Sequence, residues 1–198
     1  VCVPCVGHIE HISDFGVVPG HINEGDALAA APHIPPHAFV PKVILGAGGA
    51  GRAAAFLCAN SGVKKVYLLN RDAAKAEEVA AKVNETLSRY GKDCVSAMAL
   101  AAYPKLLTGA AHRYIVIQCT SVGLTPKAEA AVLEDGDFYR SVKFGYDLIY
   151  TPWETKFMKL VTANGGTAFN GLKMLLYQGV DAFECWTGTK VEKETADK

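Results

Sequence analysis

The fold of this chain is decided by the stretch Val43-Ile44-Leu45-Gly46-Ala47-Gly48-Gly49-Ala50-Gly51-Arg52-Ala53-Ala54. A short apolar run leads into a Gly-x-Gly-x-x-Gly turn, and an alanine-rich segment of helical composition follows. The first glycine allows a tight turn, the second lets the backbone approach a pyrophosphate, and the third lets helix and strand pack closely. The N–H groups at the helix start attract phosphate. The predicted phosphate-binding residues are Gly46, Gly48, Gly49, Ala50 and Gly51.

A second predicted strand supports this interpretation. Residues 65–69 read Lys-Val-Tyr-Leu-Leu, and the strand ends at Asn70-Arg71-Asp72, about twenty residues beyond the glycine turn. In a dinucleotide-binding fold this strand end contacts the adenosine ribose. A glycine turn alone is equally compatible with a simple link between strand and helix, so the second strand favours a dinucleotide site.

From residue 42 onward, apolar runs of strand length alternate with segments of helical period. Strands are predicted at 42–45, 65–69, 95–98, 114–119, 146–150 and 167–169, and helices at 49–61, 72–90, 151–164 and from 170. The helix at 151 is predicted from Thr151-Pro152-Trp153-Glu154, which has the pattern of a capping box. Alternating strands and helices favour an α/β, Rossmann-like doubly wound fold, with a mainly parallel sheet and helices on both faces.

The strand at 114–119 ends at Thr120-Ser121-Val122-Gly123. The carboxyl ends of parallel strands border the ligand crevice, so Thr120 and Ser121 are predicted to lie near the cofactor. For Ser121, a hydroxyl that only caps the turn is an equally good interpretation.

Composition excludes several classes of function. Lys plus Arg and Asp plus Glu both number 20, so the formal net charge is zero. This balance argues against a nucleic-acid partner or a polybasic membrane surface. The sequence shows no apolar run of membrane-spanning length and no signal-peptide pattern. The six cysteines are scattered, which indicates free thiols in a reducing, cytoplasmic setting.

Residues 1–41 differ from the rest, with six prolines, five of the six histidines and no lysine or arginine. They are predicted to form an irregular arm or the remnant of a substrate domain, before a dinucleotide-binding domain at 42–188 and a charged tail at 189–198. The arm contains Cys2-x-x-Cys5-x-x-His8-x-x-His11, whose ligand types suit zinc. The spacing departs from that of zinc fingers, so no metal site is assigned.

Five segments together resemble the C-terminal, NADP-binding domain of the shikimate dehydrogenase and quinate/shikimate dehydrogenase family. The resemblance runs from about residue 42 to 188. It rests on Gly46–Gly51, Asn70-Arg71, Thr120–Leu124, Tyr146-Asp147-Leu148-Ile149-Tyr150-x-Pro152-x-x-Thr155, and Asn170-Gly171-Leu172-x-Met174-Leu175-Leu176-Tyr177-Gln178-Gly179. General dinucleotide folds lack the last two segments.

The resemblance implies an oxidoreductase of the shikimate pathway, which serves aromatic amino acid biosynthesis by hydride transfer between NADP(H) and 3-dehydroshikimate or shikimate. Asn70 and Arg71 would hold the 2′-phosphate and adenine. Met174 would lie against the nicotinamide, and Tyr150 and Gln178 would contact a substrate of shikimate or quinate type. Where the family commonly has threonine, this chain has Asp72, which leaves NAD open as the cofactor.

The family's substrate domain supplies a Lys–Asp pair that handles the proton, and residues 1–41 contain no match to it. The catalytic residues are therefore unknown. A separate substrate domain or a homodimer would complete such an enzyme. The alternative is a non-catalytic dinucleotide-binding module or partner subunit. A different Rossmann reductase, of the glutamyl-tRNA type, is disfavoured by the last two segments.

Overall fold

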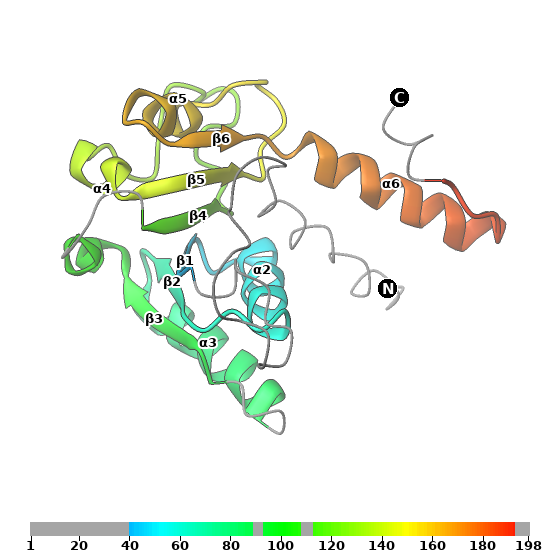
Figure 1. Cartoon of the computed structure of the whole chain (residues 1–198), viewed down its shortest axis with the longest axis horizontal. Helices are drawn as coiled ribbons and strands as arrows, with labels where there is room; N and C mark the ends of the chain where they lie inside the picture. The colour runs from blue at the N-terminus through cyan, green and yellow to red at the C-terminus, as the bar shows by residue number, and fades with distance from the viewer. Residues whose placement is uncertain (1–39, 89–92, 108–112, 193–198) are drawn as a thin grey trace, which may run out of the picture.

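The computed structural model of the chain describes residues 40–88, 93–107 and 113–192 (Figure 1). The predicted arm up to residue 39, the tail beyond residue 192, and the cysteines and histidines considered for zinc lie outside these ranges.

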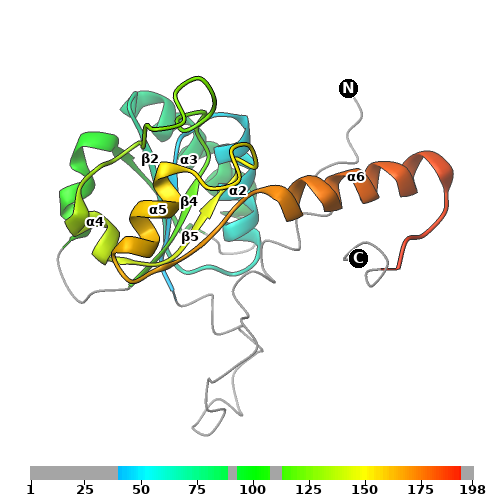
Figure 2. The same cartoon turned by 90° about the horizontal axis from the view of Figure 1, so that it is seen from above.

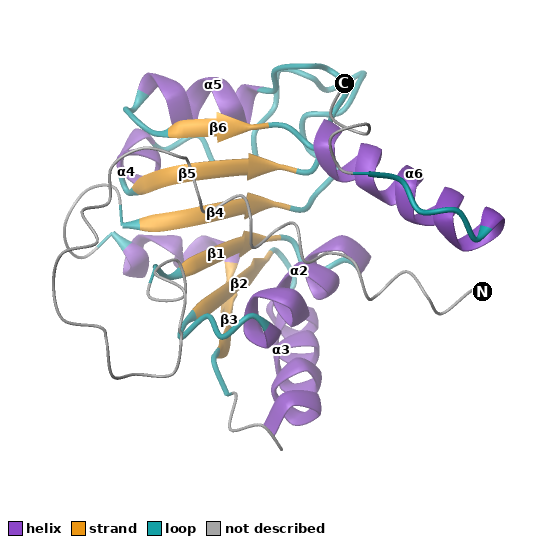
Figure 3. Cartoon of the chain, turned by 45° about the vertical axis from the view of Figure 1, so that its right-hand side comes forward, coloured by secondary structure: helices purple, strands orange, loops and turns teal. Residues whose placement is uncertain are grey.

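Six parallel strands form a single sheet. They are β1 (Lys42–Leu45), β2 (Val66–Asn70), β3 (Val95–Ala99), β4 (Tyr114–Gln118), β5 (Val142–Asp147) and β6 (Thr167–Phe169). Their order across the sheet is β3-β2-β1-β4-β5-β6 (Figure 3). The chain therefore builds one half of the sheet outward from β1 and returns to build the other from β4. This arrangement confirms the doubly wound fold and places the crevice at the carboxyl ends of the neighbouring strands β1 and β4, where the strand order reverses.

Helices cover both faces of the sheet because side chains on its strands alternate between two cores. Ile44 points into one core, with the buried faces of α2 (Gly49–Asn60) and α3 (Ala73–Ser88). Its neighbours Val43 and Leu45 point into the other core, with η3 (Leu100–Leu106), α4 (Gly136–Arg140) and α5 (Lys156–Ala163). All three β1 residues are fully buried.

The ends of α2 and α3 follow the predicted local signals. Gly62 follows α2 with a φ of +84°, a backbone conformation that suits glycine. Asp72 precedes α3, and its Oδ1 accepts a hydrogen bond from the Lys75 amide at 3.3 Å. Helix α3 is described as far as Ser88, so its predicted end at residue 90 lies outside the described residues.

The predictions around β5 and α5 were wrong in their boundaries. Strand β5 begins at Val142 and ends at Asp147, so residues 148–150 form a loop. The capping box at 151–154 does not start a helix. Helix α5 begins at Lys156, and Thr155 is its N-cap, with its hydroxyl accepting from the Met158 amide at 3.3 Å. The buried side chain of Asp147 holds the Thr155 hydroxyl at 2.6 Å, which fixes the helix start there.

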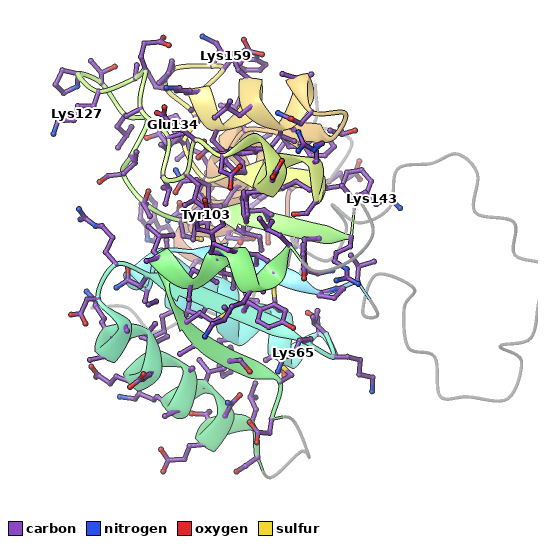
Figure 4. The ribbon with its side chains drawn as sticks, turned by 90° about the vertical axis from the view of Figure 1, so that its left-hand side faces the viewer. Lys65, Tyr103, Lys127, Glu134, Lys143 and Lys159 are labelled. Atoms are coloured by element: carbon purple, nitrogen blue, oxygen red, sulfur yellow. The ribbon has the colours of Figure 1, made fainter. Side chains whose placement is uncertain are left out.

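Helix α4 was not predicted. Asp135 caps it, because its Oδ1 accepts from the Asp137 amide at 2.8 Å. Phe138 and Tyr139 on this helix are fully buried. The Tyr103 hydroxyl of η3 donates to Asp135 Oδ2 at 2.7 Å, which ties the two helices together over the sheet (Figure 4).

Helix α6 (Leu172–Thr187) extends away from the sheet (Figures 1 and 2). The predicted apolar face is present but largely uncovered among the described residues: none of the helix's residues is buried, and Leu172, Leu175, Leu176 and Phe183 are all more than a third exposed. The predicted cap also shifts by one residue, since Gly171 is the N-cap while Asn170 Oδ1 accepts from the Leu172 amide. Beyond the helix, the Val191 amide bonds back to Glu184.

Candidate functional site

A cleft of about 570 Å³ opens at the carboxyl ends of β1, β2 and β4. Backbone bonds set its walls: the Gly46 amide donates to Leu69 of β2, and the Cys119 amide donates to Leu45 of β1. Its size is that of a small-molecule or cofactor site. The lining comprises Gly46, Ala47, Gly48, Leu69, Asn70, Arg71, Lys75, Leu100, Cys119, Thr120, Ser121, Val122, Ala131 and Val132.

The glycine loop forms the floor of this cleft. Gly46 has a φ of +103°, and a Cβ there would lie 2.7 Å from Thr120 Cγ2, so only glycine fits the turn. At Gly48, by contrast, a Cβ would meet nothing within 4 Å, because the backbone faces open space. Gly48 is also the N-cap of α2, and no side chain caps this helix start. The first amides of α2, which include those of Gly49, Ala50 and Gly51, are therefore available to an anion.

The end of β2 forms the cationic wall. Arg71 and Lys75 both line the cleft, and both are exposed. Asn70 is engaged internally: its Oδ1 accepts from the Ala47 amide at 3.3 Å, and its Nδ2 donates to the Asp72 carbonyl at 3.0 Å. Asn70 therefore joins the end of β2 to the glycine loop. Asp72 caps α3 and is not part of the lining.

Sequence reasoning missed Lys75, which lies one helical turn after Asp72. The signal was present: a lysine in the first turn of the helix that follows the ribose-binding strand points to the same corner as Arg71. The apolar lining from Leu100, Ala131 and Val132 was also missed. The last two lie between β4 and α4, in a segment without periodicity, and no sequence signal would have found them.

The Thr120–Gly123 turn forms the opposite wall. Gln118, fully buried at the end of β4, holds this turn through its side-chain amide. Its Oε1 accepts from the Thr120 amide at 2.6 Å, and its Nε2 donates to the carbonyls of Thr120 and Val122. The Thr120 hydroxyl in turn accepts from the Val122 amide at 3.1 Å, so it shapes the turn that it lines.

A buried carboxylate lies behind this wall. Asp147, at the end of β5, is fully buried and accepts from the Thr155 hydroxyl at 2.6 Å, the Ile149 amide at 3.0 Å and Gln118 Nε2 at 3.3 Å. Burial raises the pKa of Asp147 to about 6, and its three hydrogen bonds oppose that rise. This hydrogen-bond network explains why the segment Tyr146–Thr155, which carries part of the family resemblance, has an aspartate at 147 and a threonine at 155.

The structure does not bring every predicted residue into this cleft. Tyr150, Met174 and Gln178 lie outside its lining. Tyr150 is 44% exposed on the loop after β5. That loop and the start of α6 are joined, because the Gly171 amide donates to the Ile149 carbonyl at 3.0 Å and Asn170 Nδ2 donates to the Trp153 carbonyl at 3.1 Å. The loop that carries Tyr150 is thus joined to the start of α6, which carries Met174, while Gln178 lies two turns along this projecting helix.

The cleft carries little acid–base chemistry of its own. Among the described residues, its lining contains no carboxylate and no imidazole. Burial raises the pKa of the Cys119 thiol far above its usual range, so this cysteine stays protonated and is a poor nucleophile. The arrangement can bind and orient a dinucleotide. The one amine of its described lining, Lys75, lies on the cationic wall with Arg71.

The chain is similar to known proteins along most of its length. A model of the Shikimate 5'-dehydrogenase C-terminal domain matches residues 171–196. A shikimate dehydrogenase (NADP(+)) of Desulforamulus reducens is 36% identical over 146 residues, which is 74% of this chain and 48% of that protein. The chain belongs to the shikimate dehydrogenase family.

Solved structures of the shikimate dehydrogenase family share the fold. A shikimate 5-dehydrogenase from Listeria monocytogenes, in complex with shikimate and NAD, is 29% identical with a TM-score of 0.68. The match covers 79% of this chain and 54% of the Listeria chain. A shikimate dehydrogenase in complex with NADP+ is 32% identical with a TM-score of 0.65. The match covers 80% of this chain and 52% of the other chain.

The chain spans about half the length of the curated relatives it matches. None of the helices in the described ranges has the length and apolar character needed to cross a membrane.

Proposed function

We propose that this chain is the NADP(H)-binding part of a shikimate dehydrogenase, and that its cleft holds the dinucleotide that exchanges hydride with shikimate or 3-dehydroshikimate. The observation that carries the proposal is the pairing of an open glycine loop at the start of α2 with two cations, Arg71 just after β2 and Lys75 in the first turn of α3. The glycine loop suits the pyrophosphate and the cations suit a 2′-phosphate.

The residues present fit an NADP molecule. The amides of Gly49–Gly51 would receive the pyrophosphate, and Arg71 with Lys75 would receive the 2′-phosphate. Asn70 would hold the glycine loop and β2 in register for both groups, through its bond to Ala47. Asp72 carries a negative charge near the same corner. Its Oδ1 bond to the α3 start directs that charge toward the helix, which reduces its repulsion of a phosphate.

When bound, the nicotinamide would supply the hydride chemistry. In the oxidative direction, shikimate would lose a hydride from its carbinol carbon to the nicotinamide and its hydroxyl proton to a base. Thr120 and Ser121 would line the cofactor pocket. Met174, Tyr150 and Gln178 would contact the nicotinamide and substrate from the joined region formed by the β5–α5 loop and α6.

The base would come from elsewhere, because the described lining holds no carboxylate or imidazole and its one lysine, Lys75, is assigned to the 2′-phosphate. A substrate domain, on the same polypeptide or on a partner, would supply it. The apolar face of α6 supports this proposal, since Leu172, Leu175, Leu176 and Phe183 are exposed and would be covered in a complete enzyme. The domain limits proposed are 42–188 for cofactor binding, with residues 1–41 as an arm or remnant of that substrate domain.

The experiment that tests the proposal is isothermal titration calorimetry of the 198-residue chain with NADP+ and with NAD+. Stoichiometric binding of NADP+, with weaker binding of NAD+, would support it. Equal affinities would still support a dinucleotide site, but they would indicate that Asp72, and not Arg71 and Lys75, determines how the 2′ position of the ribose is recognised. Binding of neither would overturn the proposal. A non-catalytic module would give the same titration. The two functions are separated by adding a shikimate dehydrogenase substrate domain to the NADP+-bound chain, because turnover should then appear only if the chain is part of an enzyme.

A further inference from the structure

Two loops that border the proposed site come from different strands. The Thr120–Gly123 turn follows β4 and lines the cleft. The loop with Tyr150 follows β5 and is bonded to the start of α6. Both loops are anchored on the same buried group, the carboxylate of Asp147.

Asp147 is one of the groups that orient the side-chain amide of Gln118. A carboxylate only accepts, so the Gln118 group that faces it must be the donor, Nε2, at 3.3 Å. The carbonyl oxygen Oε1 is thereby directed to the Thr120 amide at 2.6 Å. The reverse orientation would place Oε1 against the carboxylate and Nε2 against an N–H donor. Nε2 also donates to the Thr120 and Val122 carbonyls, so Asp147 is one of three acceptors that hold the side-chain amide in this orientation.

The other side of the same carboxylate fixes the second loop. The Ile149 amide donates to Oδ1 at 3.0 Å, and the Thr155 hydroxyl donates to Oδ2 at 2.6 Å. These bonds set both ends of the segment between Ile149 and Thr155, which carries Tyr150. The Ile149 carbonyl also accepts a hydrogen bond from the Gly171 amide, which connects this loop to the start of α6.

We propose that Asp147 is a positioning residue: its ionised carboxylate, acting through Gln118, holds the cofactor-side turn at Thr120–Gly123 while it fixes the loop that carries Tyr150. The proposal rests on the proposed dinucleotide function for its consequence, but the coupling itself is a property of the unliganded chain. Protonation of Asp147 weakens both anchors together, so dinucleotide affinity falls as the carboxylate becomes neutral.

The electrostatic surroundings place this change in a measurable pH range. The carboxylate has a pKa of about 6 because burial disfavours its charge. The titratable groups that sense it are Cys119, after β4, and Tyr139, on α4. Burial raises the pKa of both, so both are neutral near pH 6. From α5, the facing group is the uncharged Thr155 at the helix start. The titration near pH 6 is therefore that of Asp147.

The first test needs no ligand. Backbone ¹H–¹⁵N shifts of the whole chain are followed from pH 5 to 8, in the wild type and in Asp147→Asn. The Ile149 amide, which donates to Asp147, should titrate with a midpoint near 6. The Thr120 amide, which reaches Asp147 only through Gln118, should follow with the same midpoint. Both titrations should be absent in Asp147→Asn. A Thr120 amide that does not move with Ile149 would overturn the coupling.

Control variants separate coupling from a merely structural role. Thr155→Ser keeps the hydroxyl and should behave as the wild type. Thr155→Val removes the α5 cap but leaves the hydrogen bond between Gln118 and Asp147, so the Thr120 amide should still titrate. Gln118→Leu removes the hydrogen bond between residue 118 and Asp147, so the Ile149 amide should titrate and the Thr120 amide should not. Loss of the Thr120 titration in Thr155→Val would assign the effect to the helix start and contradict the proposal.

The second test measures NADP+ affinity by calorimetry at each pH. The 2′-phosphate itself takes a proton near pH 6, so the informative quantity is the ratio of the two dissociation constants, variant over wild type. Asp147→Asn should bind about tenfold more weakly at pH 7.5. The ratio should approach one at pH 5, where the wild-type carboxyl is also neutral. A ratio independent of pH would overturn the role in binding. If the wild type binds no dinucleotide, the proposed function fails, while the ligand-free titration still decides the coupling.

Discussion

Gly51 lies directly against the backbone carbonyl of Gly46, so closely that a Cβ on Gly51 would overlap the Gly46 oxygen. The third glycine of the motif is therefore required by the packing of α2 on the turn after β1, and the second glycine, at Gly48, faces open space. Two glycines three residues apart thus serve different purposes, one structural and one for ligand approach.

The first prediction follows from this difference. Gly51→Ala should lower the free energy of unfolding by about 1–3 kcal/mol, because the neighbouring atom is backbone and cannot rotate away. Gly48→Val should leave the thermal midpoint close to that of the wild type, since its φ of −78° and its open surroundings accept a side chain. It should nevertheless abolish NADP+ binding by blocking the pyrophosphate. Thermal unfolding and calorimetry on the same two proteins check both statements; normal binding by Gly48→Val would make the loop a structural turn only.

The second prediction concerns the 2′-phosphate. Arg71→Ala and Lys75→Ala should each weaken NADP+ binding by on the order of 1.5–3 kcal/mol, the value of a charged phosphate contact. NAD+ affinity should change little in either variant, because NAD+ lacks that phosphate. Calorimetry with both cofactors gives the two values.

Asp72→Asn is the matched control for this corner of the cleft. It keeps an oxygen that accepts from the Lys75 amide, so α3 should keep its cap while the negative charge is removed. NADP+ affinity should rise modestly and NAD+ affinity should not. A loss of NAD+ binding in this variant would instead show that Asp72 holds the 2′-hydroxyl.

The third prediction gives the sign of a pH effect on stability. The pKa of Asp147 is about 6 in the folded chain and 3.8 as its ordinary value. Between these values the folded state holds more protons than the unfolded state, so this group makes stability fall as pH rises from about 4 to 6. The ionised form costs on the order of 2–3 kcal/mol above that window. The difference in unfolding free energy between the wild type and Asp147→Asn, from urea titrations at each pH, should therefore change across pH 4–6 and be constant above pH 7.

The sequence predicted the sheet and the phosphate loop because their signals are local. A strand that runs into glycines determines its own turn, and Asp72 determines the start of α3. The predictions failed where tertiary contacts decide. Glycine is unfavourable within strands, yet Gly145 lies inside β5. The packing of α5 requires glycine there, because a Cβ would come within 2.7 Å of Val161. Likewise, the helix start at Thr155 depends on Asp147, eight residues earlier, and no local pattern contains that bond.

The site divides in the same way. Gly46, Gly48, Asn70, Arg71, Thr120 and Ser121 were predicted from the strand ends and do line the cleft. The internal use of Asn70 could not be predicted, because it depends on the distance from β2 to the Ala47 amide. The roles of Tyr150, Met174 and Gln178 came from resemblance, and none of the three lines the cleft, so no geometric feature of the described residues assigns them.

The fourth prediction is that this chain alone turns over shikimate with NADP+ at a rate near background, even where the cofactor binds well. The described lining contains no carboxylate or imidazole to take the hydroxyl proton, and general acid–base assistance contributes roughly 10²–10⁴-fold. The apolar side chains of α6 are exposed among the described residues, and positioning of the substrate by a second surface would contribute several kcal/mol more. The assay is NADPH formation at saturating shikimate and cofactor, with Gln178→Ala as control. A robust rate that is lost in Gln178→Ala would show that the chain holds a complete active site, with its base among the residues outside the described ranges. An unchanged background rate in both proteins, with NADP+ bound, would leave cofactor binding as the activity of this part of the enzyme.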